Sequence, residues 1–106
     1  MSLRIAYSSV RLTEAQACAY MFALVNQEFA KEGYDCWLTS AKDGRHSQDS
    51  LHYNGLGLDF RTKHVDRTTM EKIYKRIKQF SSPIFDVVWE DQGGDNEHLH
   101  VEYHPD

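Results

Sequence analysis

The spacing of apolar positions predicts two amphipathic helices. One covers residues 13–32 and the other about 67–80, because apolar side chains recur in both at intervals of three and four residues. Residues 13–16 have the composition of a capping box, as do residues 68–71, and Gly33 is placed to end the first helix. We expect both apolar stripes to face the core. They consist of Cys18, Met21, Phe22, Val25 and Phe29 in the first helix, and of Met70, Ile73, Tyr74, Ile77 and Phe80 in the second.

Shorter apolar runs between and after the helices predict strands. Residues 36–39 form a short candidate, and residues 56–60 have strand-like apolar content that two neighbouring glycines are expected to bend. Residues 84–90 and 98–103 alternate apolar with polar side chains on either side of a polar turn, which predicts an antiparallel hairpin. Residues 41–54 are polar and show no period, and this predicts a loop.

These elements predict a single α+β domain over residues 1–106, with two helices packed against a small antiparallel sheet. The content of 41% hydrophobic and 26% charged residues is ordinary for a globular protein. A formal net charge of -4 with no basic stripe argues against nucleic acid as a partner. No apolar run approaches the ~20 residues of a membrane-spanning helix, so no membrane partner is predicted. We expect a monomer.

The N-terminal residues 1–7 contain neither the apolar segment nor the small-residue cleavage site of a signal peptide. We therefore expect synthesis in the cytoplasm, with help from another protein to reach any target outside it. Two cysteines, Cys18 and Cys36, are too few for a disulfide framework or a cysteine-based zinc site. Both lie in apolar segments and are predicted to be buried free thiols.

The distribution of the six histidines points to a metal site. In the predicted last strand the two-residue period places His98 and His100 on one face and Leu99 on the other. Two adjacent imidazoles suit a metal, although a polar outer face can also carry two histidines. Asp59 stands inside an apolar run, where a carboxylate is costly to bury unless it is paired or coordinated. A turn at residues 54–55 would allow His52 to converge with it.

Together, His52, Asp59 and one histidine of the hairpin supply two imidazoles and a carboxylate. Three nitrogen and oxygen ligands with an open fourth position are typical of a catalytic zinc site. Zinc would lower the pKa of a bound water from ~15.7 to ~7, so that hydroxide forms at neutral pH. Residue spacing alone leaves His98 and His100 equivalent as the third ligand.

The pattern Ser50-x-His52-x-x-Gly55-x-x-x-Asp59, followed by a strand and His98-x-His100, resembles a known superfamily. This superfamily comprises the zinc D-Ala-D-Ala carboxypeptidases, related peptidoglycan endopeptidases and the signaling domain of hedgehog proteins. Residues 44–55 and 85–90 are closest to the hedgehog version. The resemblance covers residues 35–104 and implies a hedgehog/D-Ala-D-Ala-peptidase-like fold.

The resemblance implies that His52, Asp59 and His100 hold a zinc ion and that His98 stabilises the oxyanion. His46 matches a further active-site histidine, and Arg45 loosely matches an arginine that orients the substrate. Ser50 is expected to form hydrogen bonds within the ligand loop. The general base is either Glu90, at the end of the preceding strand, or Glu97, three residues before the last histidine. Strand alternation favours Glu90. These catalytic and substrate-binding expectations concern Glu90, Glu97, His98, Arg45, His46 and Ser50.

The function implied is that of a zinc metallopeptidase that hydrolyses peptide bonds in bacterial peptidoglycan. It would be a D-Ala-D-Ala carboxypeptidase or an endolysin-like endopeptidase of phage or bacterial origin, which acts on the cell wall once released. The peptide of peptidoglycan is the expected partner and Zn²⁺ the expected cofactor. The alternative is a non-catalytic zinc-binding interaction module with the same fold, which shares the zinc ligands and differs at the base.

Overall fold

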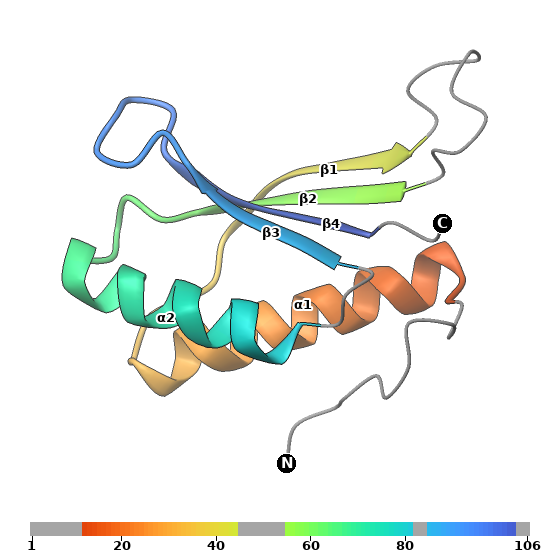
Figure 1. Ribbon diagram of the computed structural model, residues 1–106, viewed down its shortest axis with the longest axis horizontal. Helices are drawn as coiled ribbons and strands as arrows, with labels where there is room; N and C mark the ends of the chain where they lie inside the picture. The colour runs from red at the N-terminus through yellow and green to blue at the C-terminus, as the bar shows by residue number, and fades with distance from the viewer. Residues whose placement is uncertain (1–11, 45–54, 82–84, 104–106) are drawn as a thin grey trace.

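A computed structural model describes residues 12–44, 55–81 and 85–103 of the chain. Its elements, in chain order, are α1 (Glu14–Lys31), β1 (Leu38–Gly44), β2 (Gly55–Arg61), α2 (Arg67–Phe80), β3 (Phe85–Glu90) and β4 (His98–Tyr103). The strands form one antiparallel sheet in the order β1-β2-β4-β3. Both helices lie on the same face of this sheet (Figure 1). The predicted α+β class is therefore confirmed, as is the hairpin of β3 and β4.

The ends of α1 carry the capping residues that the sequence predicts, a capping box at the N-terminus and a glycine after the C-terminus. The hydroxyl of Thr13 accepts a hydrogen bond from the backbone N–H of Gln16, and the Gln16 side chain accepts one from the backbone N–H of Thr13. This capping box satisfies two amide groups that the first turn leaves without helical partners. Gly33 follows the helix with a φ of 81°, a left-handed conformation that costs glycine little.

The start of α2 and the extent of β1 differ from the prediction. Asp66 is the N-cap of α2, because its carboxylate accepts a hydrogen bond from the backbone N–H of Thr69 at 3.0 Å. The predicted capping box at residues 68–71 is therefore wrong, since the helix begins before it. Residues 41–44 belong to β1 and were wrongly assigned to a loop. Among the described strands, β1 lies at the edge of the sheet and pairs with β2 alone. An edge strand tolerates polar residues, so its sequence shows no alternation of apolar and polar positions.

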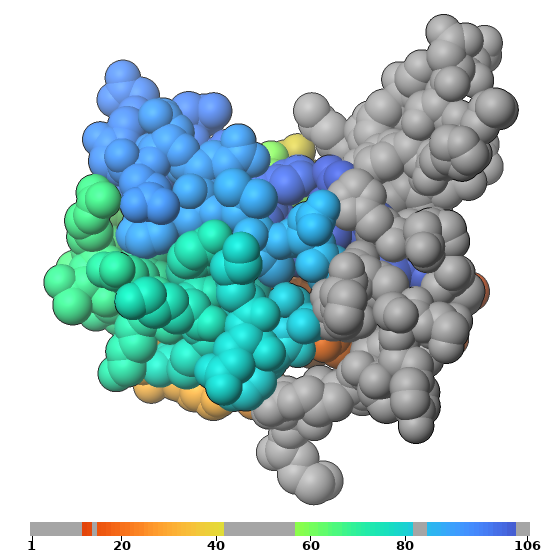
Figure 2. All heavy atoms as spheres, viewed as in Figure 1, coloured from red at the N-terminus to blue at the C-terminus, as the bar shows by residue number. Residues whose placement is uncertain are grey.

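The core lies between the helices and the inner face of the sheet. Strands β3 and β4 alternate strictly, with Leu99 and Val101 fully buried on the inner face as predicted. The ring of Tyr20 on α1 stacks on Phe85 of β3, with the centroids 4.9 Å apart. In the space-filling view α2 covers the lower part of one side, and the turn between β3 and β4 stands above it (Figure 2).

Neither of the described helices lies on the opposite, outer face of the sheet (Figure 1). The polar side chains of β2, β3 and β4 can therefore meet on that face.

Both cysteines are free, as predicted, but they are half-buried rather than buried. Neither described helix combines the length and the apolar character needed to cross a membrane.

Candidate metal centre

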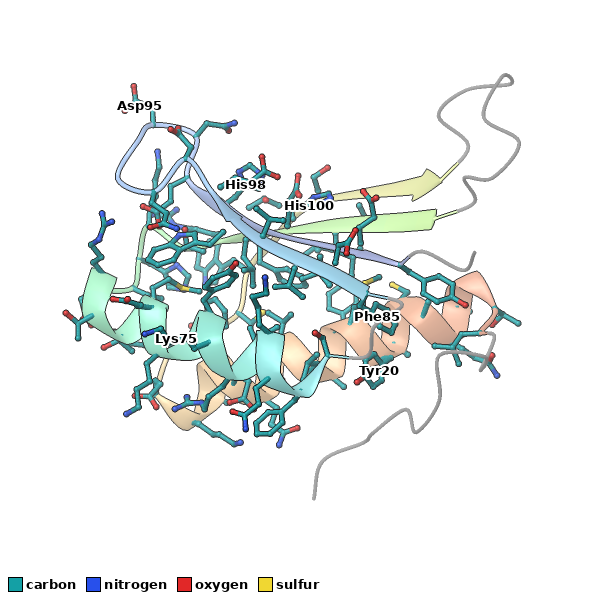
Figure 3. The ribbon with its side chains drawn as sticks, in the orientation of Figure 1. Tyr20, Lys75, Phe85, Asp95, His98 and His100 are labelled. Carbon is teal, nitrogen blue, oxygen red and sulfur yellow. The ribbon has the colours of Figure 1, made fainter. Side chains whose placement is uncertain are left out.

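The register of the central strands places four predicted site residues side by side on the outer face. Asp59 of β2 lies opposite His100 of β4, and Glu90 of β3 lies opposite His98. Their inner-face neighbours are buried in the core, so alternation directs these four side chains away from the helices. Figure 3 shows His98 and His100 projecting from the sheet on the side that the helices leave open.

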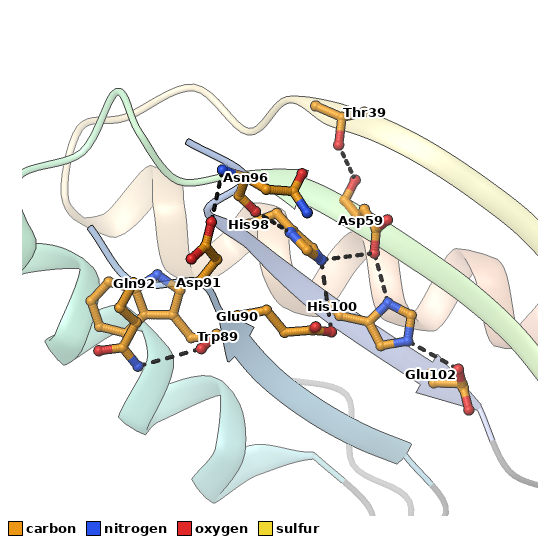
Figure 4. Close-up of polar contacts among 10 residues, drawn as sticks. All are labelled: Thr39, Asp59, Trp89, Glu90, Asp91, Gln92, Asn96, His98, His100 and Glu102. Atoms are coloured by element: carbon orange, nitrogen blue, oxygen red, sulfur yellow. Dashed lines mark hydrogen bonds and ion pairs between the residues drawn. The ribbon is translucent and has the colours of Figure 1, made fainter. Parts of the chain in front are cut away.

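Asp59, His98 and His100 form a compact cluster. The Oδ1 atom of Asp59 is 2.6 Å from Nδ1 of His100 and 3.8 Å from Nε2 of His98. One potential ligand atom of each residue lies within 4.8 Å of those of the other two. The three side chains are half-buried, with between 18% and 28% of their surface exposed, so solvent reaches the cluster from one side (Figure 4).

Hydrogen bonds on the far side of each ring orient both imidazoles. Nδ1 of His98 is 2.7 Å from the backbone carbonyl of Asn96, to which it donates its proton, so that the Nε2 lone pair points to the cluster. Nε2 of His100 is 2.9 Å from Oε1 of Glu102, and this leaves Nδ1 facing Asp59. A carboxylate or carbonyl behind a histidine is the usual arrangement that fixes the ring of a metal ligand.

Two carboxylates change the proton affinity of His100. Burial favours the neutral ring, but the hydrogen bonds and charges of Asp59 and Glu102 outweigh that effect and raise the pKa of His100 above its ordinary value. The site between Nδ1 and the Asp59 carboxylate therefore attracts positive charge. A metal cation that displaced the proton from Nδ1 would meet the same attraction.

The donor set fits a divalent metal. Two imidazole nitrogens and one carboxylate oxygen are ligands that zinc takes in catalytic sites. Among the described ranges, this is the one group of three potential ligands that lies close enough to share an ion. Asp59, His98 and His100 can thus hold a metal ion, which agrees with the predicted metal chemistry without identifying the metal.

The structure brings together only some of the predicted site residues. Asp59 and His100, predicted as ligands, are in contact, and His98, predicted to face the substrate, stands beside them as a third potential donor. Four other predicted residues lie outside the described part of the chain, and these are the ligand His52 and the substrate-binding residues Arg45, His46 and Ser50.

Glu90 and Glu97 have different surroundings. The Oε1 atom of Glu90 is 3.7 Å from Nε2 of His98, and 48% of its side chain is exposed. The carboxylate of Glu97 instead accepts hydrogen bonds that hold it within the turn between β3 and β4. Partial burial opposes its ionisation, but these bonds prevail and keep the pKa of Glu97 below its ordinary value. The donors are the hydroxyl of Thr62, the indole N–H of Trp89 and the backbone N–H of Gly93.

Two residues of the site were not anticipated from the sequence. Glu102 continues the alternation that places His98 and His100 on one face, so the two-residue period could have indicated it. Gly57 lies beneath the ring of His100, and a Cβ atom at this position would be 3.2 Å from Cε1 of that ring. Its proximity depends on the pairing of β2 with β4, which local sequence does not reveal.

The chain was compared with protein-family models, with curated proteins and with solved structures, and none of the three comparisons finds a match. A function is therefore inferred from the residues of the site and from their geometry.

Proposed function

We propose that the chain is a zinc-dependent peptidase that hydrolyses peptide bonds in bacterial peptidoglycan. The observation that supports this most directly is the cluster of Asp59, His98 and His100 on the sheet face opposite the two helices, with Glu90 3.7 Å from His98. The substrate class follows from the resemblance of residues 50–59 and 98–100 to the D-Ala-D-Ala carboxypeptidase and endopeptidase superfamily. A hedgehog/D-Ala-D-Ala-peptidase-like fold belongs to the same proposal.

The proposed zinc ligands are His52, Asp59 and His100. Asp59 and His100 already face each other, and Glu102 fixes the second nitrogen of the histidine. Asp59 is the fifth residue of β2, about 13 Å along the strand from its first residue. His52 precedes β2 by three residues and lies outside the described part of the chain. In this assignment His98 is available to the substrate.

Zinc bound at this site would supply Lewis-acid activation of a water molecule and of the scissile carbonyl group. Glu90 would accept the proton of the attacking water, because its exposed carboxylate lies beside the cluster. In its doubly protonated form, His98 would donate Nε2–H to the carbonyl oxygen and stabilise its negative charge, while Nδ1–H stays bonded to the Asn96 carbonyl. The carboxylates of Asp59 and Glu90, 3.8 Å and 3.7 Å from Nε2, are placed to accept this proton when no substrate is bound. Glu97 has a structural role, since the turn engages its carboxylate.

Glu90→Gln and Glu97→Gln provide a matched pair of variants for testing this assignment. Each variant is loaded with zinc, its metal content is measured, and its initial rate is followed on purified muropeptides. We expect Glu90→Gln to retain zinc and to lose about 10²–10⁴-fold in kcat, the usual contribution of a general base. Glu97→Gln should retain most of the wild-type kcat, although it should be less stable.

If the zinc-loaded wild-type protein cleaves no muropeptide, the peptidase proposal fails. Stoichiometric zinc in such a protein would instead favour the non-catalytic zinc-binding module. Equal rates for wild-type protein and Glu90→Gln would remove Glu90 as the base.

A further inference from the structure

Two cations stand beside the metal cluster on the outer face of the sheet. Arg61 follows Asp59 by two residues on β2 and lies opposite His98, so strand alternation places it on the same face as the cluster. Lys63 follows Arg61 by two more residues. Both side chains line a cavity of about 590 Å³ together with Asp59 and His98. An anionic group in this cavity would therefore lie next to the metal site.

Arg61 and Lys63 differ from the cations of the helices in their partners. Lys31, Lys72, Lys75 and Arg76 form ion pairs with glutamates. Neither Arg61 nor Lys63 has an ion-pair partner within residues 12–44, 55–81 and 85–103. In the part of the chain that the structure describes, the ammonium group of Lys63 donates one hydrogen bond, to the backbone carbonyl of Asp95. Both cations therefore retain hydrogen-bonding capacity for an anion.

An exposed tryptophan holds the guanidinium of Arg61 in place. The central carbon of this group lies 5.8 Å from the ring centroid of Trp37, and the backbone N–H of Arg61 donates to the Trp37 carbonyl at 2.9 Å. Trp37 is 55% exposed, which is high for an aromatic side chain. A guanidinium that lies over an aromatic ring keeps its N–H donors available, and its restricted motion means that less entropy is lost when it binds a carboxylate.

Within the described residues, the acidic groups around the cavity form no ion pair with Arg61 or Lys63. Asp59 is a proposed metal ligand, and its charge would be balanced by the ion. The Glu97 carboxylate is directed into the turn, where it accepts three hydrogen bonds from other residues. Asp95 stands at the tip of the turn between β3 and β4, where its side chain points away from the sheet (Figure 3). In the metal-loaded protein the cavity would therefore carry an excess of positive charge.

We propose that Arg61 and Lys63 form an anion subsite that binds a carboxylate of the peptide substrate beside the metal centre. This inference rests on the proposed peptidase function and adds a requirement for a charged group near the cleaved bond. Arg61 would bind the carboxylate through two parallel N–H donors and Lys63 as a point charge. The carboxylate can be the C-terminus of the peptide, as in a carboxypeptidase substrate, or an acidic side chain within it.

Three matched peptides distinguish these sources. The first is N-acetylated L-Lys-D-Ala-D-Ala with a free C-terminal carboxylate, and the second is its neutral C-terminal amide. The third is the amide with D-Glu in place of the first D-Ala, so that its one carboxylate is internal. Dissociation constants are measured by calorimetry on the zinc-loaded full chain carrying Glu90→Gln, which suppresses turnover. Arg61→Gln and Lys63→Gln are then added singly, and Lys75→Gln, a charge-matched change on α2, is the control.

We expect one of the charged peptides to bind at least about 10-fold more tightly than the neutral amide. Arg61→Gln should abolish that difference, Lys63→Gln should reduce it, and Lys75→Gln should leave it unchanged. Preference for the first peptide identifies the terminal carboxylate, and preference for the third identifies an internal one. If neither charged peptide binds more tightly than the amide, or if Arg61→Gln behaves like Lys75→Gln, the subsite is refuted.

Failure of the subsite and failure of the peptidase can be told apart. Cleavage of all three peptides by the wild-type protein at equal efficiency would keep the peptidase and refute the subsite. Charge-dependent binding that requires Arg61, without cleavage of any peptide by the wild-type protein, would keep the subsite and refute the peptidase.

Discussion

Asp59 and His100 face each other across neighbouring strands, with Oδ1 of the aspartate 2.6 Å from Nδ1 of the histidine. On the other side of the ring, Nε2 is 2.9 Å from the carboxylate of Glu102. The imidazole is thus held at both nitrogens by acidic groups. One nitrogen and the Asp59 carboxylate can share a metal ion, while the contact with Glu102 fixes the orientation of the ring.

Glu102→Gln should weaken zinc binding about 10–100-fold, because the ring of His100 loses the carboxylate that orients it and raises its basicity. The measurement is a competition titration with a chelator of known affinity. Glu71→Gln, an exposed change on α2 with the same loss of charge, is the control and should bind zinc like the wild-type protein. Equal zinc affinities in all three proteins would mean that Glu102 has no part in the site.

Gly57→Ala tests the packing beneath the same ring. The added Cβ would lie 3.2 Å from Cε1 of His100, so the ring has to move by a few tenths of an ångström. We expect weaker zinc binding in the same titration, while thermal unfolding of the metal-free protein changes little, since alanine is compatible with a strand. A variant that binds zinc as tightly as the wild-type protein would show that the position of the ring is not critical.

Glu97 should contribute to stability at neutral pH and lose that contribution in acid. Its folded-state pKa lies below the ~4.3 of an unfolded glutamate, so the stabilisation is complete above that value and disappears as the pH falls through the folded-state pKa. Glu97→Gln should lower the free energy of unfolding at pH 7 by about 1–3 kcal/mol. Urea unfolding between pH 3 and pH 7 should show a smaller acid-induced loss in the variant. Identical pH profiles would contradict this role.

The two faces of the sheet should respond differently to truncation. Leu99 is fully buried on the inner face, and Leu99→Ala should cost about 2–5 kcal/mol through lost burial and a cavity. Val88 is 44% exposed and lies opposite His100, so Val88→Ala should cost less than about 1 kcal/mol. Urea unfolding measures both variants. Comparable losses would contradict the assignment of the core to the helix side.

Local sequence predicted the elements whose signals are local. The apolar period and the Thr13 capping box located α1, and alternation located β3 and β4. The extent of β1 was missed because an edge strand exposes much of its surface and needs no hydrophobic period. The cap of α2 was missed because two N-terminal caps are compatible with the sequence there. They are Asp66, which is the observed cap, and the capping box at residues 68–71, which lies closer to the apolar stripe.

The sequence predicted which residues form the site better than it predicted how they are arranged in space. Alternation placed His98 and His100 on one face, but the pairing of Asp59 with His100 joins residues 41 positions apart and depends on sheet register. The surroundings of His64 are a second example. Its ring lies 6.0 Å from that of Phe29, and Nε2 is 2.7 Å from the Asp35 carbonyl. Such contacts arise from packing that local sequence does not encode.

Zinc stoichiometry tests whether Asp59 and His100 bind a metal ion. Elemental analysis and calorimetry are performed on the wild-type protein and on Asp59→Ala, His100→Ala and the control His64→Ala, with folding checked by circular dichroism. We expect one zinc per chain in the wild-type protein and in His64→Ala, and loss of tight binding in the other two. A folded wild-type protein without zinc, or folded His100→Ala protein that binds zinc equally well, would show that these residues do not form a metal site.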